Sequence, residues 1–122
     1  NDVLSQMDQA IREGVQRIAD QAGLSFDLEQ IFYYAPVPFD RSCVAAVDGA
    51  ARSCGYSARK IVTGAGHDAC FIAHAAPTSM VFIPCVDGIS HNEVEDIEPE
   101  WSTAGANVMF HAILSKAGRG ET

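Results

Sequence analysis

The sequence is poor in positive charge and contains no long apolar run. Its 122 residues include 8 Lys and Arg against 16 Asp and Glu, so the formal net charge is −8 at pH 7. This charge repels phosphate backbones, and no cluster of basic and aromatic residues opposes that repulsion. No stretch approaches the roughly 20 apolar residues of a membrane helix, and residues 1–12 lack the basic start and apolar centre of a secretory signal. We therefore expect neither a nucleic-acid partner nor a membrane partner.

The sequence also lacks closely paired cysteines. The four cysteines contain no C-x-x-C pair: Cys43, Cys54, Cys70 and Cys85. Disulfide frameworks are typical of small secreted domains, whereas this spacing favours small packed side chains. We therefore expect reduced cysteines and a cytoplasmic protein. With 48% hydrophobic and 20% charged residues, the composition is that of a soluble globular domain.

Three stretches have the spacing and the end signals of helices. The first begins near Val3, has apolar residues three and four positions apart, and is closed by Gly23. The second is capped by Asp40 and ends at Gly55. The third runs from about residue 99 to 118. Its residues expected to be buried are Trp101, Val108, Met109 and Ile113.

Extended segments are expected between these helices. Alternating aromatic and apolar residues predict a strand within 26–34, and shorter apolar runs predict strands at 59–62 and 80–84. A glycine loop and a short helix over about 67–75 separate the last two strands, which gives a β-α-β pattern with parallel strands. Prolines near residue 37 mark a boundary, so the sequence predicts an α/β protein with segments 1–38 and 39–122.

The loops after the two later strands carry the candidate functional residues. Parallel sheets bind ligands beyond the carboxyl ends of their strands, so we expect both loops at one site. Gly64 and Gly66 precede a helix and resemble an anion cradle, although a plain strand-to-helix turn explains them equally well. His67 begins that helix beside Asp68, which could fix its tautomer or cap the helix.

The second loop contains His91, which is followed by several carboxylates that could orient a metal-binding imidazole. An incidental histidine at the start of an acidic helix is the plainer interpretation. Catalytic zinc usually needs three or more protein ligands, and this chain offers few. Two nucleophile arrangements are weaker hypotheses. They are a Cys70–His67 thiol–imidazole pair and a Ser90, His91, Asp87 hydrolase site.

Several motifs occur in order along the chain: Thr63-Gly-Ala-Gly-His-Asp-Ala69, Ala76-Pro-Thr-Ser-Met80, Val81-Phe-Ile-Pro-Cys85, Asp87-Gly-Ile-Ser-His-Asn92, Glu95 and Glu98-Pro-Glu-Trp101. Together they resemble the metal-dependent amidohydrolases that include N-carbamoyl-L-amino acid hydrolase, β-ureidopropionase and allantoate amidohydrolase. Similarity extends over most of the chain and thins over the first helix.

This resemblance implies the C-terminal part of a catalytic domain that holds two divalent metals, preceded by the closing helix and strand of a lid and dimerisation domain. It implies that His91 is a metal ligand and that Gly66 and His67 contact the substrate, an N-carbamoyl amino acid or another ureido compound. The metals would be zinc, manganese, cobalt or nickel. No catalytic residue is expected here, because the general-base glutamate would lie upstream. The full-length protein would be a homodimer, and this chain alone would be inactive.

Two other functions remain open. A related peptidase or deacylase would share the metal site. A self-standing binding or oligomerisation module would use the first helix and strand as a dimer edge and the glycine loop for small anions.

Overall fold

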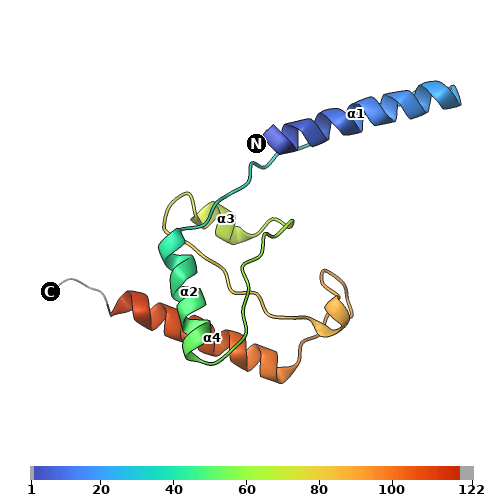
Figure 1. Ribbon diagram of the computed structural model, residues 1–122. Helices are drawn as coiled ribbons and strands as arrows, with labels where there is room; N and C mark the ends of the chain where they lie inside the picture. The colour runs from blue at the N-terminus through green and yellow to red at the C-terminus, as the bar shows by residue number, and fades with distance from the viewer. Residues whose placement is uncertain (1, 119–122) are drawn as a thin grey trace. The chain divides into compact units, whose positions relative to one another are not determined.

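The computed structural model describes residues 2–118 and divides the chain into two compact units, Asn1–Val37 and Pro38–Thr122. None of the helices in this described part is long and apolar enough to cross a membrane. The helices are α1 (Asp2–Ala22), α2 (Arg41–Ser53), α3 (Asp68–Ile72), the 3₁₀ helix η1 (Val86–Gly88) and α4 (Pro99–Ala117) (Figure 1).

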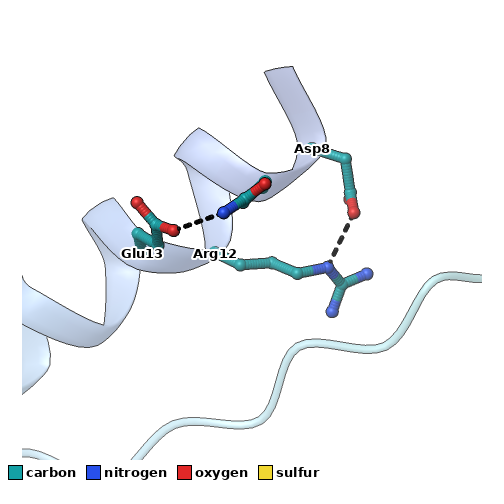
Figure 2. A network of polar contacts seen from close by, with 4 residues as sticks. Asp8, Arg12 and Glu13 are labelled. Atoms are coloured by element: carbon teal, nitrogen blue, oxygen red, sulfur yellow. Dashed lines mark hydrogen bonds and ion pairs between the residues drawn. The ribbon is translucent and has the colours of Figure 1, made fainter. Parts of the chain in front are cut away.

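Helix α1 forms most of the first unit and confirms the predicted first helix. Gly23 has a φ of 65° and closes it, with the Leu24 N–H donating to the Ala19 carbonyl at 2.9 Å. Polar pairs four residues apart cover one side, as Figure 2 shows for the Arg12 guanidinium and the Asp8 carboxylate, 2.9 Å apart. The apolar side chains stay exposed within this unit. They are Val3, Met7, Ile11 and Ile18, with exposed fractions of 56–69%.

Helices α2 and α4 pack against each other and form the core of the second unit (Figure 1). The buried residues are small, which lets the two helices approach closely. They are Ala50, Ala51, Val108 and Ala112. Val47, Tyr56 and Val81 pack around this core, so the extended segment containing Val81 is tied to the helix pair.

The predicted cap of α2 is present and also connects distant parts of the second unit. The Asp40 carboxylate accepts from the Cys43 N–H at 2.8 Å and from the Ser42 hydroxyl at 2.6 Å. These two hydrogen bonds, the one from Ser42 first, lower the pKa of Asp40 to about 2. The Lys116 ammonium, at the end of α4, donates to the Ser42 hydroxyl at 2.6 Å. The network therefore connects the start of α2 to the end of α4.

The predicted strands are not confirmed, because the structure assigns no strand between residues 2 and 118. Segments 26–34, 59–62 and 80–84 are neither helix nor turn, yet they lack the ladder of hydrogen bonds that defines a strand. A strand needs a partner strand for its N–H and C=O groups. The described part of the fold is therefore α-rich, and the β-α-β pattern has no support in it.

The last two helices differ from expectation in length and burial. Helix α3 covers five residues, shorter than the predicted 67–75, and turns follow it. Helix α4 begins with Pro99 as expected, but only Val108 of the four named residues is fully buried. Met109 and Ile113 are 53% and 59% exposed, so their predicted burial is wrong here. No described segment covers these two side chains.

Candidate functional site

One hollow of the second unit has a volume of about 460 Å³ and brings the two histidine loops together. Its lining mixes apolar side chains with groups capable of acid–base or metal chemistry. It is lined by His67, Val81, Phe82, Ile83, Cys85, Ser90, His91, Glu95 and Ile97. The segment 81–85 thus forms one wall, and the two histidine loops contribute the polar groups.

The His67 ring is held by contacts with two residues. Its Nε2 lies 3.1 Å from the Thr63 hydroxyl, which also accepts from the Ala65 N–H at 3.1 Å. Its edge packs against Phe82, with the ring centroids 5.4 Å apart. If the Thr63 hydroxyl donates to Nε2, the ring proton lies on Nδ1. The sequence left Asp68 either to fix the tautomer or to cap the helix, but the Thr63 hydroxyl contacts the ring and His67 is the N-cap residue.

The glycine loop before His67 differs from the expected anion cradle. Neither Gly64 nor Gly66 has a positive φ, and a Cβ at either position would meet nothing within 4 Å. Helix α3 is too short to provide a strong dipole, and His67 is its N-cap residue without a side-chain cap bond. Gly66 is not among the residues that line the hollow. The geometry is that of a plain turn that places His67.

His91 lies in a tightly closed loop. The Val86 N–H donates to the Asp96 carbonyl at 2.8 Å and joins the ends of the loop. Asp87 and His91 have φ values of 54° and 55°, in the left-handed region that non-glycine residues seldom adopt. The His91 imidazole is exposed, and between residues 2 and 118 it makes no hydrogen bond. It is therefore available to an outside ligand.

Glu95 is the carboxylate that organises this loop. Its Oε2 accepts from the His91 backbone N–H at 2.7 Å, and its Oε1 accepts from the Cys85 thiol at 3.6 Å. Partial burial, and then this neighbouring carboxylate, raise the pKa of the Cys85 thiol. The sequence indicated carboxylates near His91, but it did not show that Glu95 would bind the backbone rather than the ring. The four-residue spacing from His91 was the only available signal.

The donor chemistry of the hollow fits part of a metal site. Imidazole nitrogen is a common ligand for divalent transition metals, and two imidazoles line the hollow. Within residues 2–118 no group of three His, Cys, Asp or Glu side chains is placed to hold a metal. Neither weaker nucleophile arrangement is formed there. Cys70 donates only its backbone N–H to the His67 carbonyl, and no hydrogen bond joins Ser90 to His91.

Residues 5–115 match the family described as Peptidase family M20/M25/M40. This chain belongs to the M20/M25/M40 family. An N-carbamoyl-L-amino-acid amidohydrolase from Rhizobium meliloti is 50% identical over 101 residues, covering 83% of this chain and 24% of that protein. An allantoate amidohydrolase from Escherichia coli is 33% identical over 93 residues, covering 76% and 23%. This M20/M25/M40 chain thus spans about a quarter of the length of these curated relatives.

Two solved structures are similar to this chain over nearly its whole length. An amidase of the hydantoinase/carbamoylase family from Burkholderia multivorans aligns with a TM-score of 0.90 and 66% identity, covering 96% of this chain and 28% of that one. A second such amidase, from Burkholderia vietnamiensis, gives a TM-score of 0.82 and 64% identity, covering 96% and 28%. The resemblance to the carbamoyl and allantoate amidohydrolases is therefore confirmed.

Proposed function

We propose that this chain is part of a metal-dependent amidohydrolase that hydrolyses the ureido C–N bond of N-carbamoyl amino acids. The observation that carries the proposal is that His67 and His91, from separate loops, line one hollow. The name of the Rhizobium meliloti relative supports the carbamoyl group as the reactive part of the substrate. Hydrolysis would release an amino acid, ammonia and carbon dioxide.

In this proposal His91 is a ligand of one of two divalent metals. Its exposed imidazole and its place on the hollow support that role. Bound divalent metals polarise a carbonyl group and lower the pKa of water. Zinc, manganese, cobalt and nickel all accept imidazole, so the ligand type leaves the metal open. The remaining ligands and the general-base glutamate would come from other residues of the full-length protein.

Gly66 and His67 are proposed as substrate contacts. The Thr63 hydroxyl and the Phe82 ring fix the plane of the His67 imidazole, which prepares it to meet a ligand in one orientation. With Nε2 held by Thr63, the Nδ1–H can donate to a carboxylate or carbonyl oxygen of the substrate. Gly66 has no side chain, so it would act through its backbone N–H.

The domain roles and the assembly are proposals of the same kind. Segment 1–38 would belong to the lid and dimerisation domain of a homodimer, and segment 39–122 to the catalytic domain. The exposed apolar residues of α1 support a role in association. Because no described group of three side chains can hold a metal, we expect the isolated chain to have no hydrolase activity.

The test uses the full-length protein with four substrate types, namely N-carbamoyl amino acids, allantoate, N-acyl amino acids and dipeptides. We expect release of ammonia from the ureido substrates and loss of that activity in His67→Ala and His91→Ala. His111→Ala is the matched control, because His111 is an exposed histidine on α4 outside the hollow. Faster cleavage of N-acyl amino acids or dipeptides would establish the deacylase or peptidase alternative. A protein that hydrolyses none of them would favour the binding module.

A further inference from the structure

Glu95 joins the two parts of the loop that carries His91. We propose that Glu95 is a positioning residue, whose carboxylate holds the His91 backbone in its left-handed conformation and so directs the imidazole into the hollow. This inference rests on the proposed function, because it concerns the role of His91 as a metal ligand. It assigns Glu95 a part in binding the metal without direct contact to it.

The hydrogen bonds of Glu95 show how it supports the loop. Oε2 is 2.7 Å from the His91 backbone nitrogen, a short distance typical of a bond to a charged acceptor. Oε1 accepts a hydrogen bond from the Cys85 thiol at 3.6 Å. Each oxygen therefore already accepts a proton donor of the protein. One of these donors lies before η1 and the other after it, so the carboxylate spans the loop.

The backbone of the loop explains why such support is needed. Asp87 and His91 have φ values of 54° and 55°, in the left-handed region that residues with a side chain seldom adopt. Unfavourable conformations persist where the surrounding structure fixes them. Gly88, with a φ of 70°, adopts its positive value without a steric cost. The bond from the His91 N–H to Glu95 fixes the backbone at His91, which lines the hollow, whereas Asp87 does not.

The direction of the imidazole depends on this backbone conformation. A change of His91 to an ordinary negative φ would rotate its Cα–Cβ bond relative to the neighbouring peptide groups. The ring would then leave the position from which it lines the hollow beside His67. Residues that orient metal ligands are commonly responsible for ten- to hundred-fold changes in metal affinity, which sets the expected effect.

A through-space effect of negative charge is the competing explanation, and the chain provides a control for it. Glu93 is also exposed and lies two residues from His91, but it makes no hydrogen bond among the described residues. Replacing Glu93 removes a similar charge without removing a bond to the loop. Glu95→Gln keeps an oxygen that can accept from the His91 N–H, whereas Glu95→Ala does not.

The experiment compares zinc binding by five full-length proteins after metal removal, using competition with a chelator. They are the wild type, Glu95→Ala, Glu95→Gln, Glu93→Ala and His91→Ala. We expect zinc affinity about ten- to hundred-fold weaker in Glu95→Ala and close to wild type in Glu95→Gln and Glu93→Ala. In ¹⁵N-histidine-labelled, metal-free protein, the His91 amide proton should lie far downfield in the wild type and move upfield only in Glu95→Ala.

Each contrary result overturns the inference. Unchanged zinc affinity in Glu95→Ala removes the role, and equal losses in Glu93→Ala or Glu95→Gln show that charge rather than the bond is responsible. If Glu95→Ala does not fold, Glu95→Asp takes its place, because the shorter side chain keeps the charge but loses the bond to the His91 N–H. Unchanged zinc affinity in Glu95→Asp would then remove the role of Glu95. If His91→Ala binds zinc as the wild type does, the proposed function fails, and the amide measurement still tests the backbone claim independently.

Discussion

Replacement of Gly105 by alanine should destabilise the second unit, although alanine favours helices. Gly105 lies in α4, and a Cβ there would stand 2.5 Å from Cγ2 of Ile83. Carbon atoms in contact prefer a separation of about 3.5–4.0 Å, so Ile83 and α4 would have to separate by roughly 1 Å. Cγ2 is attached to the Cβ of Ile83 and cannot swing aside as the end of a longer side chain would.

The expected magnitude follows from two opposing effects. Overpacking of this kind typically costs about 1–3 kcal/mol, whereas exchanging glycine for alanine inside a helix gains about 1 kcal/mol. The net loss of unfolding free energy for Gly105→Ala is then roughly 0–2 kcal/mol. Gly49→Ala is the matched control, because Gly49 is inside α2 and a Cβ there meets nothing within 4 Å. It should gain the full amount of about 1 kcal/mol.

Urea unfolding of the full-length protein measures the difference between the two variants, which should be about 1–3 kcal/mol at an unchanged m value. Adding Ile83→Ala removes Cγ2 and should turn Gly105→Ala from destabilising into stabilising relative to Ile83→Ala alone. Equal stabilisation by Gly105→Ala and Gly49→Ala would refute the close approach of α4 to Ile83. Because Ile83 lines the hollow, that result would also question the wall of the proposed site.

Two further predictions follow from pKa values. Because the folded pKa of Asp40 is lowered from 3.8 to about 2, its stabilising contribution should be complete above pH 3.8 and lost as the pH falls towards 2. Asp40→Asn should weaken this part of the acid dependence of unfolding, and an unchanged profile would contradict the cap. Burial and Glu95 raise the pKa of the Cys85 thiol, so it should react with iodoacetamide more slowly than an unperturbed thiol at mildly alkaline pH. Glu95→Gln should speed that reaction, and a rate equal to that of the wild type would argue against the contact between Cys85 and Glu95.

The helices could be predicted from the sequence because their signals are local. Apolar spacing, the Asp40 cap and the terminal Gly23 lie within the elements that they define, and α1, α2 and α4 all agree with them. Whether the extended segments form strands could not be predicted in this way. Pairing of strands depends on residues distant in sequence, and the described residues contain no partner strand for segments 59–62 and 80–84. The predicted burial of Met109 was wrong for a related reason, because burial also depends on residues distant in sequence and no described residue covers this side chain.

The sequence predicted which residues belong to the candidate site better than it predicted the contacts between them. The glycine–histidine patterns indicated His67 and His91 because each histidine follows a turn after an apolar segment, and both line the hollow. Their roles as substrate contact and metal ligand stay predictions. The partners Thr63 and Glu95 could not be chosen from the sequence, because several hydroxyls and carboxylates lie equally near. In the structure the His91 N–H, where φ is 55°, donates to Glu95, and the His67 ring contacts Thr63.

The most direct test of the central claim is the divalent metal content of the full-length protein, compared with its His91→Ala and His111→Ala variants. The proposed function predicts about two metals per subunit in the wild type and in His111→Ala, and fewer in His91→Ala. A wild-type protein without bound metal, or a His91→Ala protein with the full metal content, would contradict it.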